Sequence, residues 1–184
     1  MAPLVGGYLA REETPMKLIQ AMKKVKGNRE KIADLQAKIA NNSAHLSHET
    51  SAYSDPKAKV NEWAQACDDL SKESVNLLTR ISKTNLETQV TVEIDGKKVA
   101  KSIAEWIWRR REFADVDLKT WRSMNDRGLK EGHLQSSTGQ PVDVKIVRNY
   151  DIDLRDKKMN EYSSEPREID SALEIANAIT DLLD

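Results

Sequence analysis

The chain of 184 residues has few of the features that mark disulfide-bonded, membrane-spanning or nucleic-acid-binding proteins. Cys67 is its single cysteine, which excludes an intrachain disulfide and suits a reducing compartment. No apolar run approaches the roughly 20 residues that span a bilayer, and the N-terminal sequence resembles no secretory signal. The formal net charge is only −1, so no overall field attracts a polyanion. We therefore expect a cytoplasmic protein, either free or part of a particle assembled inside the cell.

Residues 1–15 differ in composition from the rest of the chain. They contain two prolines, a Gly-Gly pair and a small apolar cluster formed by Leu4, Val5, Tyr8 and Leu9. Two interpretations remain open: a flexible tail, or an arm whose apolar side chains dock on a neighbouring subunit or a larger assembly.

Residues 16–184 predict one mainly helical domain. Only 5% of the residues are aromatic and 32% are charged, which is typical of helices with narrow apolar stripes and broad solvated faces. A first helix begins near Met16, and five apolar residues recur in one of its heptad positions: Leu18, Val25, Ile32, Ile39 and Leu46. Asn28 and Asn42 take alternate positions, where they would weaken the seam and could fix its register.

A second helix is expected from about Pro56 to Asn85, with the same heptad spacing and with Cys67 on its packed face. Two long helices joined by a short loop predict a coiled-coil-like antiparallel hairpin. The first fold expectation is therefore an antiparallel helical bundle built on this hairpin.

A small β-element should interrupt the helices at about residues 88–100. Its apolar and polar residues alternate, and Asp95-Gly96 is a strong two-residue hairpin signal. A turn there would set Val92 opposite Val99 and Glu93 opposite Lys98. Residues 142–148 also alternate like a strand, and they could pair with this hairpin at one end of the bundle.

The remaining chain predicts helices and one loop. Ser102 and Glu105 form a capping box that starts a third helix, which should end near Asp126 with Gly128 as its C-cap. Residues 129–141 are expected to form a mobile loop. A short helix should follow at about 153–162, and Pro166 should break or kink the chain before a last helix.

Three consecutive arginines, Arg109 to Arg111, stand beside two tryptophans in the third helix. At about 100° per residue, Ile103, Trp106 and Phe113 share an apolar face, while Trp108 points to the far side. Arg110 falls inside the apolar face, and its two neighbours fall on opposite margins. The arginines therefore form no single patch, and no nucleic-acid partner is expected.

An inward Arg110 requires a counter-charge, because an unpaired buried guanidinium costs several kcal/mol. Asp117 lies two turns later on almost the same line of the helix, and Asp170 is the other candidate partner. The favoured interpretation is a structural ion pair. The alternative is a ligand-anchoring or catalytic arginine.

No catalytic, metal-binding or cofactor-binding set stands out. His45 and His48 have a spacing that can bind metal, but no third ligand is near them in the sequence. Phosphate-loop, nucleophile-elbow and H-E-x-x-H motifs are absent. Glu165-Pro-Arg-Glu168 matches only the E-x-x-E half of the paired acidic motifs of all-helical nucleotide pyrophosphohydrolases. We expect no cofactor.

Separate segments of the chain resemble a bacterial family known as septicolysin-like. The segment that begins MKLIQAMKKVKG at Met16 resembles its opening helix, and REIDSALEIAN at 167–177 resembles its last helix. Residues 80–90 (RISKTNLETQV) and 95–113 (DGKKVAKSIAEWIWRRREF) resemble its I-x-x-T-N-x-x-T segment, its glycine turn and its R-R-D-containing helix.

This resemblance implies the bundle and the hairpin, and the family's name suggests cytolysis. It departs from the family pattern at residues 1–15, at Glu112 where the family tends to have Asp, and at Pro166. Together with the helical pattern of Asp117, it nominates a buried polar cluster: Asn85, Arg110, Asp117, Asp170 and Asn177.

The leading functional hypothesis is a non-enzymatic structural or interaction protein. It would self-associate as a homo-oligomer, or dock on a protein assembly, through helical surfaces and the N-terminal arm. One alternative is a small-molecule-binding or hydrolytic bundle centred on Arg110. Another is a cytolysin-like protein.

Overall fold

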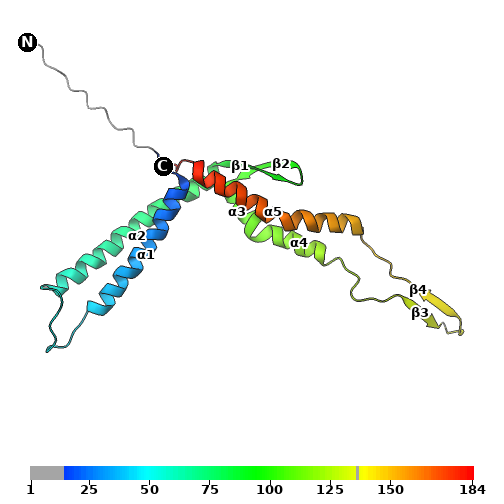
Figure 1. The fold of residues 1–184 in the computed structure, drawn as a ribbon, viewed down its shortest axis with the longest axis horizontal. Helices are drawn as coiled ribbons and strands as arrows, with labels where there is room; N and C mark the ends of the chain where they lie inside the picture. The colour runs from blue at the N-terminus through cyan, green and yellow to red at the C-terminus, as the bar shows by residue number, and fades with distance from the viewer. Residues whose placement is uncertain (1–14, 136) are drawn as a thin grey trace, which may run out of the picture. The chain divides into compact units, whose positions relative to one another are not determined.

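The computed structural model describes residues 15–135 and 137–184, and these residues are mainly helical with small antiparallel sheets (Figure 1). The expected fold class is confirmed at this level. Within the described residues no helix combines the length and the apolarity that a membrane crossing requires. The predicted arm residues Leu4, Val5, Tyr8 and Leu9 lie outside the described part of the chain.

The chain divides into two compact units. The first contains the residues up to Asn85 together with Asn177–Asp184, and the second is Leu86–Ala176. The boundaries fall near the ends of two long helices. A single domain over 16–184 stays a prediction, and each unit is described by itself below.

The first unit is built on α1 (Leu18–Asn42) and most of α2 (Pro56–Glu87), which lie side by side (Figure 1). Asn28 is buried, and its side-chain amide donates to the Glu73 carboxylate over 2.8 Å. The Cys67 sulfur lies 4.0 Å from the Ile32 carbonyl oxygen. Because the later residue of α1 contacts the earlier residue of α2, the two helices run in opposite directions at these contacts.

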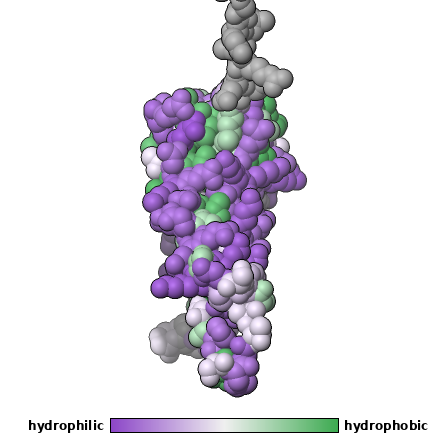
Figure 2. Space-filling view, turned by 90° about the vertical axis from the view of Figure 1, so that its left-hand side faces the viewer, coloured by the Kyte–Doolittle hydropathy of each residue, from purple (hydrophilic) through white to green (hydrophobic). Residues whose placement is uncertain are grey.

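The first helix is shorter than the heptad pattern predicts. It ends at Asn42, so Leu46 is exposed beyond it, and His45 and His48 lie in the connection that follows the helix. The burial of the heptad residues also declines along α1: Leu18 and Val25 are buried, whereas Ile39 is only partly covered. The outer surface of this region is mostly hydrophilic, with apolar residues in small patches (Figure 2).

The last residues of the chain complete the first unit. The Leu18 amide donates to the Thr180 carbonyl oxygen over 2.9 Å, and the Leu182 amide donates to the Met16 carbonyl oxygen over 2.7 Å. These bonds provide partners for backbone groups at the start of α1 that have none within the helix. The buried side chain of Leu182 adds to the core there.

The second unit begins with the hairpin β1 (Gln89–Ile94) and β2 (Lys97–Ser102). Asp95 and Gly96 both have positive φ, as a type I′ turn requires. Val92 pairs with Val99 and Glu93 with Lys98, so the predicted turn and register are confirmed. The capping box of Ser102 and Glu105, which starts α3 (Ile103–Trp108), is also confirmed.

The third predicted helix is divided by a π-helical turn. α3 is followed by η1 (Arg109–Phe113), in which hydrogen bonds span five residues, and then by α4 (Ala114–Arg122). Two expectations were wrong here. The helix ends at Arg122 rather than near Asp126, and Gly128 is not its C-cap, because Gly128 lies with Arg127 in a separate positive-φ turn.

The β-elements and the last helix also differ from expectation. β3 (Gly132–Gln135) falls in the predicted loop and pairs antiparallel with β4 (Pro141–Val144). In the described residues β4 does not pair with the first hairpin, and it ends before residue 148. A single helix, α5 (Ile152–Ile179), continues through Pro166. Burial of Ile169, Leu173 and Ala176 after the proline stabilises the helix despite the lost backbone bond.

Candidate functional site

The most enclosed polar group of the second unit is an ion-pair cluster around Arg109. Arg109 Nε donates to Glu165 Oε1 over 2.7 Å, and Nη2 donates to Oε2 over 2.8 Å. Arg109 Nη1 donates to Asp117 Oδ2. The Glu165 side chain is only 4% exposed and the Arg109 side chain 19%. η1, α4 and α5 are therefore linked by one guanidinium that holds two carboxylates.

The π-helical turn explains why Arg109 has this role and Arg110 does not. A turn with bonds spanning five residues advances each residue by a smaller angle than an α-helix does, so a wheel at 100° per residue fails after Trp108. The predicted faces hold up to that point, since Trp106 is buried and Trp108 is exposed. After it, Phe113 is exposed, although it belongs to the predicted apolar face.

The predicted inward position of Arg110 was therefore wrong. Its side chain is 46% exposed, and it forms a bidentate pair with Asp170 in which both distances are 2.8 Å. Asp170, one of its two expected partners, is thus its actual partner. Asp117, the other, contacts Arg109 instead.

The predicted buried polar cluster does not form as a buried set. None of its five members is fully buried: Arg110 and Asp170 are exposed, and Asp117, Asn85 and Asn177 are partly covered. Asn85 and Asn177 also belong to the first unit, whereas the other three belong to the second. Asp117 is the one member that contacts the enclosed Arg109–Glu165 pair.

Sequence reasoning missed Glu165, although a signal for it was present. Glu165 lies four residues before Ile169 and eight before Leu173, on the apolar stripe of α5. A carboxylate on such a stripe needs a cationic partner. The assumption that Pro166 ends a helix removed Glu165 from that stripe.

The charges in this cluster are held firmly. The hydrogen bonds from Arg109 to Glu165, and then those to Asp117, raise the pKa of the guanidinium further above its usual value, against the opposing effect of burial. The Arg109 guanidinium also stacks on the Tyr162 ring, 5.4 Å from the ring centroid. The Arg109 guanidinium therefore stays charged across the physiological pH range.

A hollow of about 230 Å³ adjoins this cluster under the first hairpin. We call it the hairpin hollow. Its walls come from β1 and β2, from Trp106 of α3, from Arg109 of η1, and from α5. Six lining residues carry its chemistry: Lys97, Lys101, Trp106, Arg109, Tyr162 and Glu165.

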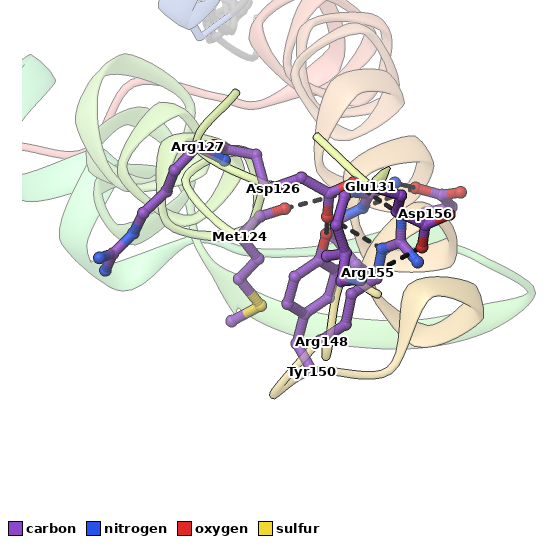
Figure 3. Close-up of polar contacts among 10 residues, drawn as sticks. Met124, Asp126, Arg127, Glu131, Arg148, Tyr150, Arg155 and Asp156 are labelled. Atoms are coloured by element: carbon purple, nitrogen blue, oxygen red, sulfur yellow. Dashed lines mark hydrogen bonds and ion pairs between the residues drawn. The ribbon is translucent and has the colours of Figure 1, made fainter. Parts of the chain in front are cut away.

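A second polar cluster lies between the end of α4 and the start of α5, and its centre is Asp126 (Figure 3). Arg148 holds Asp126 through two hydrogen bonds of 2.9 and 2.7 Å, and the Tyr150 hydroxyl donates to the same carboxylate over 3.1 Å. Arg155 donates to the Met124 carbonyl oxygen over 3.1 Å. Arg127 extends away from the group (Figure 3). These bonds join the two segments that lead into and out of β3 and β4.

The histidines are placed differently from a metal site. The exposed His133 imidazole lies with its Nδ1 2.5 Å from Asp143 Oδ1 across the β3–β4 ribbon. Over the described residues, no group of three or more His, Cys, Asp or Glu side chains has the arrangement of a metal site.

A family of unknown function, DUF6847, matches residues 13–182. No curated protein and no solved structure matches the chain. The resemblance to septicolysin-like proteins stays a prediction.

Proposed function

We propose that this chain, which belongs to the DUF6847 family, is a non-enzymatic structural protein that self-associates. The observation that carries this proposal is an exposed apolar surface on the α3–η1–α4 segment. Trp108, Phe113 and Val116 are each more than half exposed there, and we call them the Trp108 face. Large apolar and aromatic side chains gathered on an exposed surface are typical of protein–protein contacts.

The three side chains belong to one side of the helical segment. Val116 follows Phe113 by three residues, a spacing that places neighbours on one helix face. Trp108 and Phe113 are five residues apart across the π-helical turn, which brings such residues toward the same side. The turn that directs Arg109 inward thus also leaves Phe113 outside.

A second copy of this chain is the partner that the surrounding charges favour. Arg111, Glu112, Asp115 and Lys119 are among the exposed residues of this segment, and these four carry equal numbers of positive and negative charges; Asp115 and Lys119 form an ion pair within one copy. Such a surface complements itself, as a two-fold interface requires. An antiparallel pairing centred on Phe113 would set Arg111 of one copy opposite Asp115 of the other. A strongly acidic or basic partner would gain little from this balance.

The resolved pKa shifts also support a structural role. Arg109 and Arg148 have a raised pKa, mainly because they donate to Glu165 and Asp126 respectively, and Asp126 has a lowered pKa because Arg148 donates to it. Each of these changes moves the pKa of the group away from neutral pH. A general acid or base works best with a pKa near the operating pH, whereas fixed ion pairs hold a scaffold together.

The proposal includes a coiled-coil-like hairpin of α1 and α2 as part of the scaffold. The opposite order of the Asn28–Glu73 and Ile32–Cys67 contacts supports it. Docking by residues 1–15, a cytoplasmic location and a homo-oligomeric state belong to the same proposal.

Light scattering coupled to size-exclusion chromatography tests the proposal on the full chain over a range of concentrations. We expect a dimer or larger species that Phe113→Glu converts to monomer without loss of helical circular dichroism. Val147→Glu is the matched control, because Val147 is 82% exposed in a different segment. A wild-type monomer at every concentration contradicts the proposal, and so does equal dissociation of the control variant.

Removal of residues 1–15 tests the arm separately. If the arm docks on a neighbouring copy, the truncated chain should form smaller or weaker complexes than the full chain. An unchanged association constant would show that these residues are a tail.

A further inference from the structure

The ribbon of β3 and β4 receives little support from the rest of the described chain (Figure 1). It is a two-stranded sheet, so within the described residues the outer edges of both strands are unpaired. Every residue of the two strands is exposed except Val144, which is half-buried. A two-stranded ribbon alone is only marginally stable in water. A further strand at one of its edges would therefore stabilise it.

One face of the ribbon is apolar. Leu134 and Val142 are opposite each other in the register, so they share a face, and they are 63% and 47% exposed. Val144 lies on the same face because it follows Val142 by two residues. Its partner in the register is Gly132, so β3 offers Val144 no side chain to pack against.

The sequence of residues 142–146, VDVKI, is complementary to itself when two copies run antiparallel. With the two-fold axis at Val144, Asp143 of one copy lies opposite Lys145 of the other, and Val142 lies opposite Ile146. Oppositely charged pairs and apolar pairs across neighbouring strands both stabilise a sheet. Lys145 is exposed and forms no ion pair within the described residues, so its ammonium is available to a second copy.

The outer edge of β4 has backbone groups in the positions that this pairing requires. β4 ends at Val144, but the chain still runs beside the approach to β3 at Ile146, whose amide donates to the Glu131 carboxylate over 3.2 Å. Backbone groups of successive strand residues point to opposite edges. Those of Asp143 and Lys145 therefore point away from β3, and in the antiparallel arrangement the two residues exchange N–H···O bonds.

Pro141 limits the length of this contact. It lies two residues before Asp143, so the edge at which it lacks an N–H is the outer one, and the β3–β4 ladder loses no bond. Pairing with a second copy therefore covers residues 142–146 only. So short a contact buries much less than the roughly 800 Å² per partner of a stable interface, and alone it is weak and transient.

We infer that β4 pairs edge to edge with β4 of a second copy, antiparallel and centred on Val144, so that two ribbons form one four-stranded sheet. A second copy is the favoured partner because residues 142–146 supply both halves of each charged and apolar pair. The contact is separate from the Trp108 face. If that face forms dimers, as proposed above, pairing through β4 joins dimers into larger assemblies, and this consequence alone rests on the proposed function.

Proline and lysine on an edge strand have another known use, because they discourage pairing with other chains. In that case, removal of the Lys145 charge increases contact between copies. If Lys145 instead pairs with Asp143 of a second copy, removal of its charge decreases the contact. The two explanations therefore predict opposite results for Lys145→Gln.

Disulfide trapping tests the contact on the full chain, in a Cys67→Ser background that removes the native thiol. Val144→Cys should form a linked dimer, because the two-fold axis sets the two thiols opposite each other. Leu134→Cys is the matched control, since it lies on the same face and is exposed. Its two copies would be about 14 Å apart in the four-stranded sheet, so cross-linking should be at least about tenfold slower. Equal rates overturn the inference.

Charge variants of the Val144→Cys chain test the register. Asp143→Lys places lysines opposite each other and should slow cross-linking about fivefold or more. The double variant Asp143→Lys/Lys145→Asp re-forms both charged pairs, so the rate should recover. In it His133 still faces an introduced lysine, so recovery does not come from a contact within one copy. A rate that stays low overturns the inference, as does faster cross-linking of Lys145→Gln.

Phe113→Glu separates this contact from self-association through the Trp108 face. Added to the cysteine variants, it should leave the preference for Val144→Cys over Leu134→Cys unchanged, because Phe113 lies in η1 rather than in the ribbon. Loss of the preference overturns the inference. A wild-type chain that is monomeric in light scattering contradicts the proposed function, whereas a retained preference in the cysteine variants still supports the β4 contact.

Discussion

Arg109 and Arg148 each hold one carboxylate through two parallel hydrogen bonds, but they do so in different surroundings. The Arg109–Glu165 pair has side-chain exposures of 19% and 4%, whereas Arg148 and Asp126 are 36% and 33% exposed. The first pair joins a helix to a residue 56 positions away in the enclosed part of the second unit. The second closes an excursion of 22 residues.

Solvent access should separate the contributions of these two similar pairs to stability. Breaking an enclosed pair leaves a charge with little water and fewer partners, which is strongly destabilising. Breaking an exposed pair lets water replace the lost partner, so little stability changes. The same bond geometry therefore fixes a core in one region and restrains a loop in the other.

Glu165→Ala should have the largest effect, because it leaves Arg109 enclosed with only Asp117 as a partner. We expect a loss of about 3–5 kcal/mol in the free energy of unfolding. Chemical denaturation followed by circular dichroism measures it. Asp126→Ala is the matched control, and similar losses in the two variants would remove the distinction between the regions.

Arg109→Lys should have a smaller effect, since it keeps the charge but loses the two-pronged geometry. A loss of roughly 1.5–3 kcal/mol is expected for one charged hydrogen bond. Arg110→Lys, at the adjacent exposed position, should alter the unfolding midpoint much less. If Arg110→Lys proved the more damaging substitution, the assignment of Arg109 as the enclosed arginine would be wrong.

Arg148→Ala should lower the melting temperature by no more than about 3 °C, as expected for an exposed pair in a chain of this size. The difference from the wild type should shrink at about 1 M salt, because salt screens exposed charges. Differential scanning calorimetry at low and high salt measures both quantities. A large, salt-independent fall in the melting temperature would show that the Asp126 cluster is enclosed to the same degree as the Arg109 cluster.

Acidification should remove the small contribution that the Asp126 cluster makes to the free energy of unfolding. Hydrogen bonds from Arg148, and a weaker one from Tyr150, lower the pKa of Asp126 below its ordinary value of 3.8. The folded-state pKa is thus below that of the unfolded chain, so the stabilisation is complete above pH 3.8 and is lost as pH falls through the folded-state pKa. A carbon-detected NMR titration measures this pKa, and Arg148→Ala should return it toward 3.8. An unchanged pKa in that variant would contradict the assigned cause.

Local sequence signals predicted local structure well. The Asp95-Gly96 turn, the pairing of Val92 with Val99 and the capping box at Ser102 are all present. Each depends on residues close together in the chain, whose backbone preferences and hydrogen bonds act over a few positions. The pairing partner of β4 was mispredicted, because β4 pairs with β3 rather than with the first hairpin. Which strands pair depends on contacts between segments farther apart in the chain than these local signals reach.

The candidate site was predicted less well, for two identifiable reasons. The π-helical turn changed the angular position of every residue after Trp108, so the inward arginine is Arg109 rather than Arg110. Pro166 was expected to interrupt a helix, and this concealed Glu165 on the apolar stripe of α5. Single-sequence periodicity assumes a uniform helix, and neither segment meets that assumption.

The sequence by itself determined the mainly helical class, the first hairpin with its register, and the presence of charged residues that need partners within the helices. Only the tertiary structure decided which charges are enclosed, that Arg109 links η1, α4 and α5, and that Lys97 and Lys101 line the hollow. The physical reason is the distance along the chain over which each kind of interaction acts. Propensity, capping and turn chemistry act between near neighbours, whereas the energy of an ion pair depends on how far the surrounding fold excludes water from it.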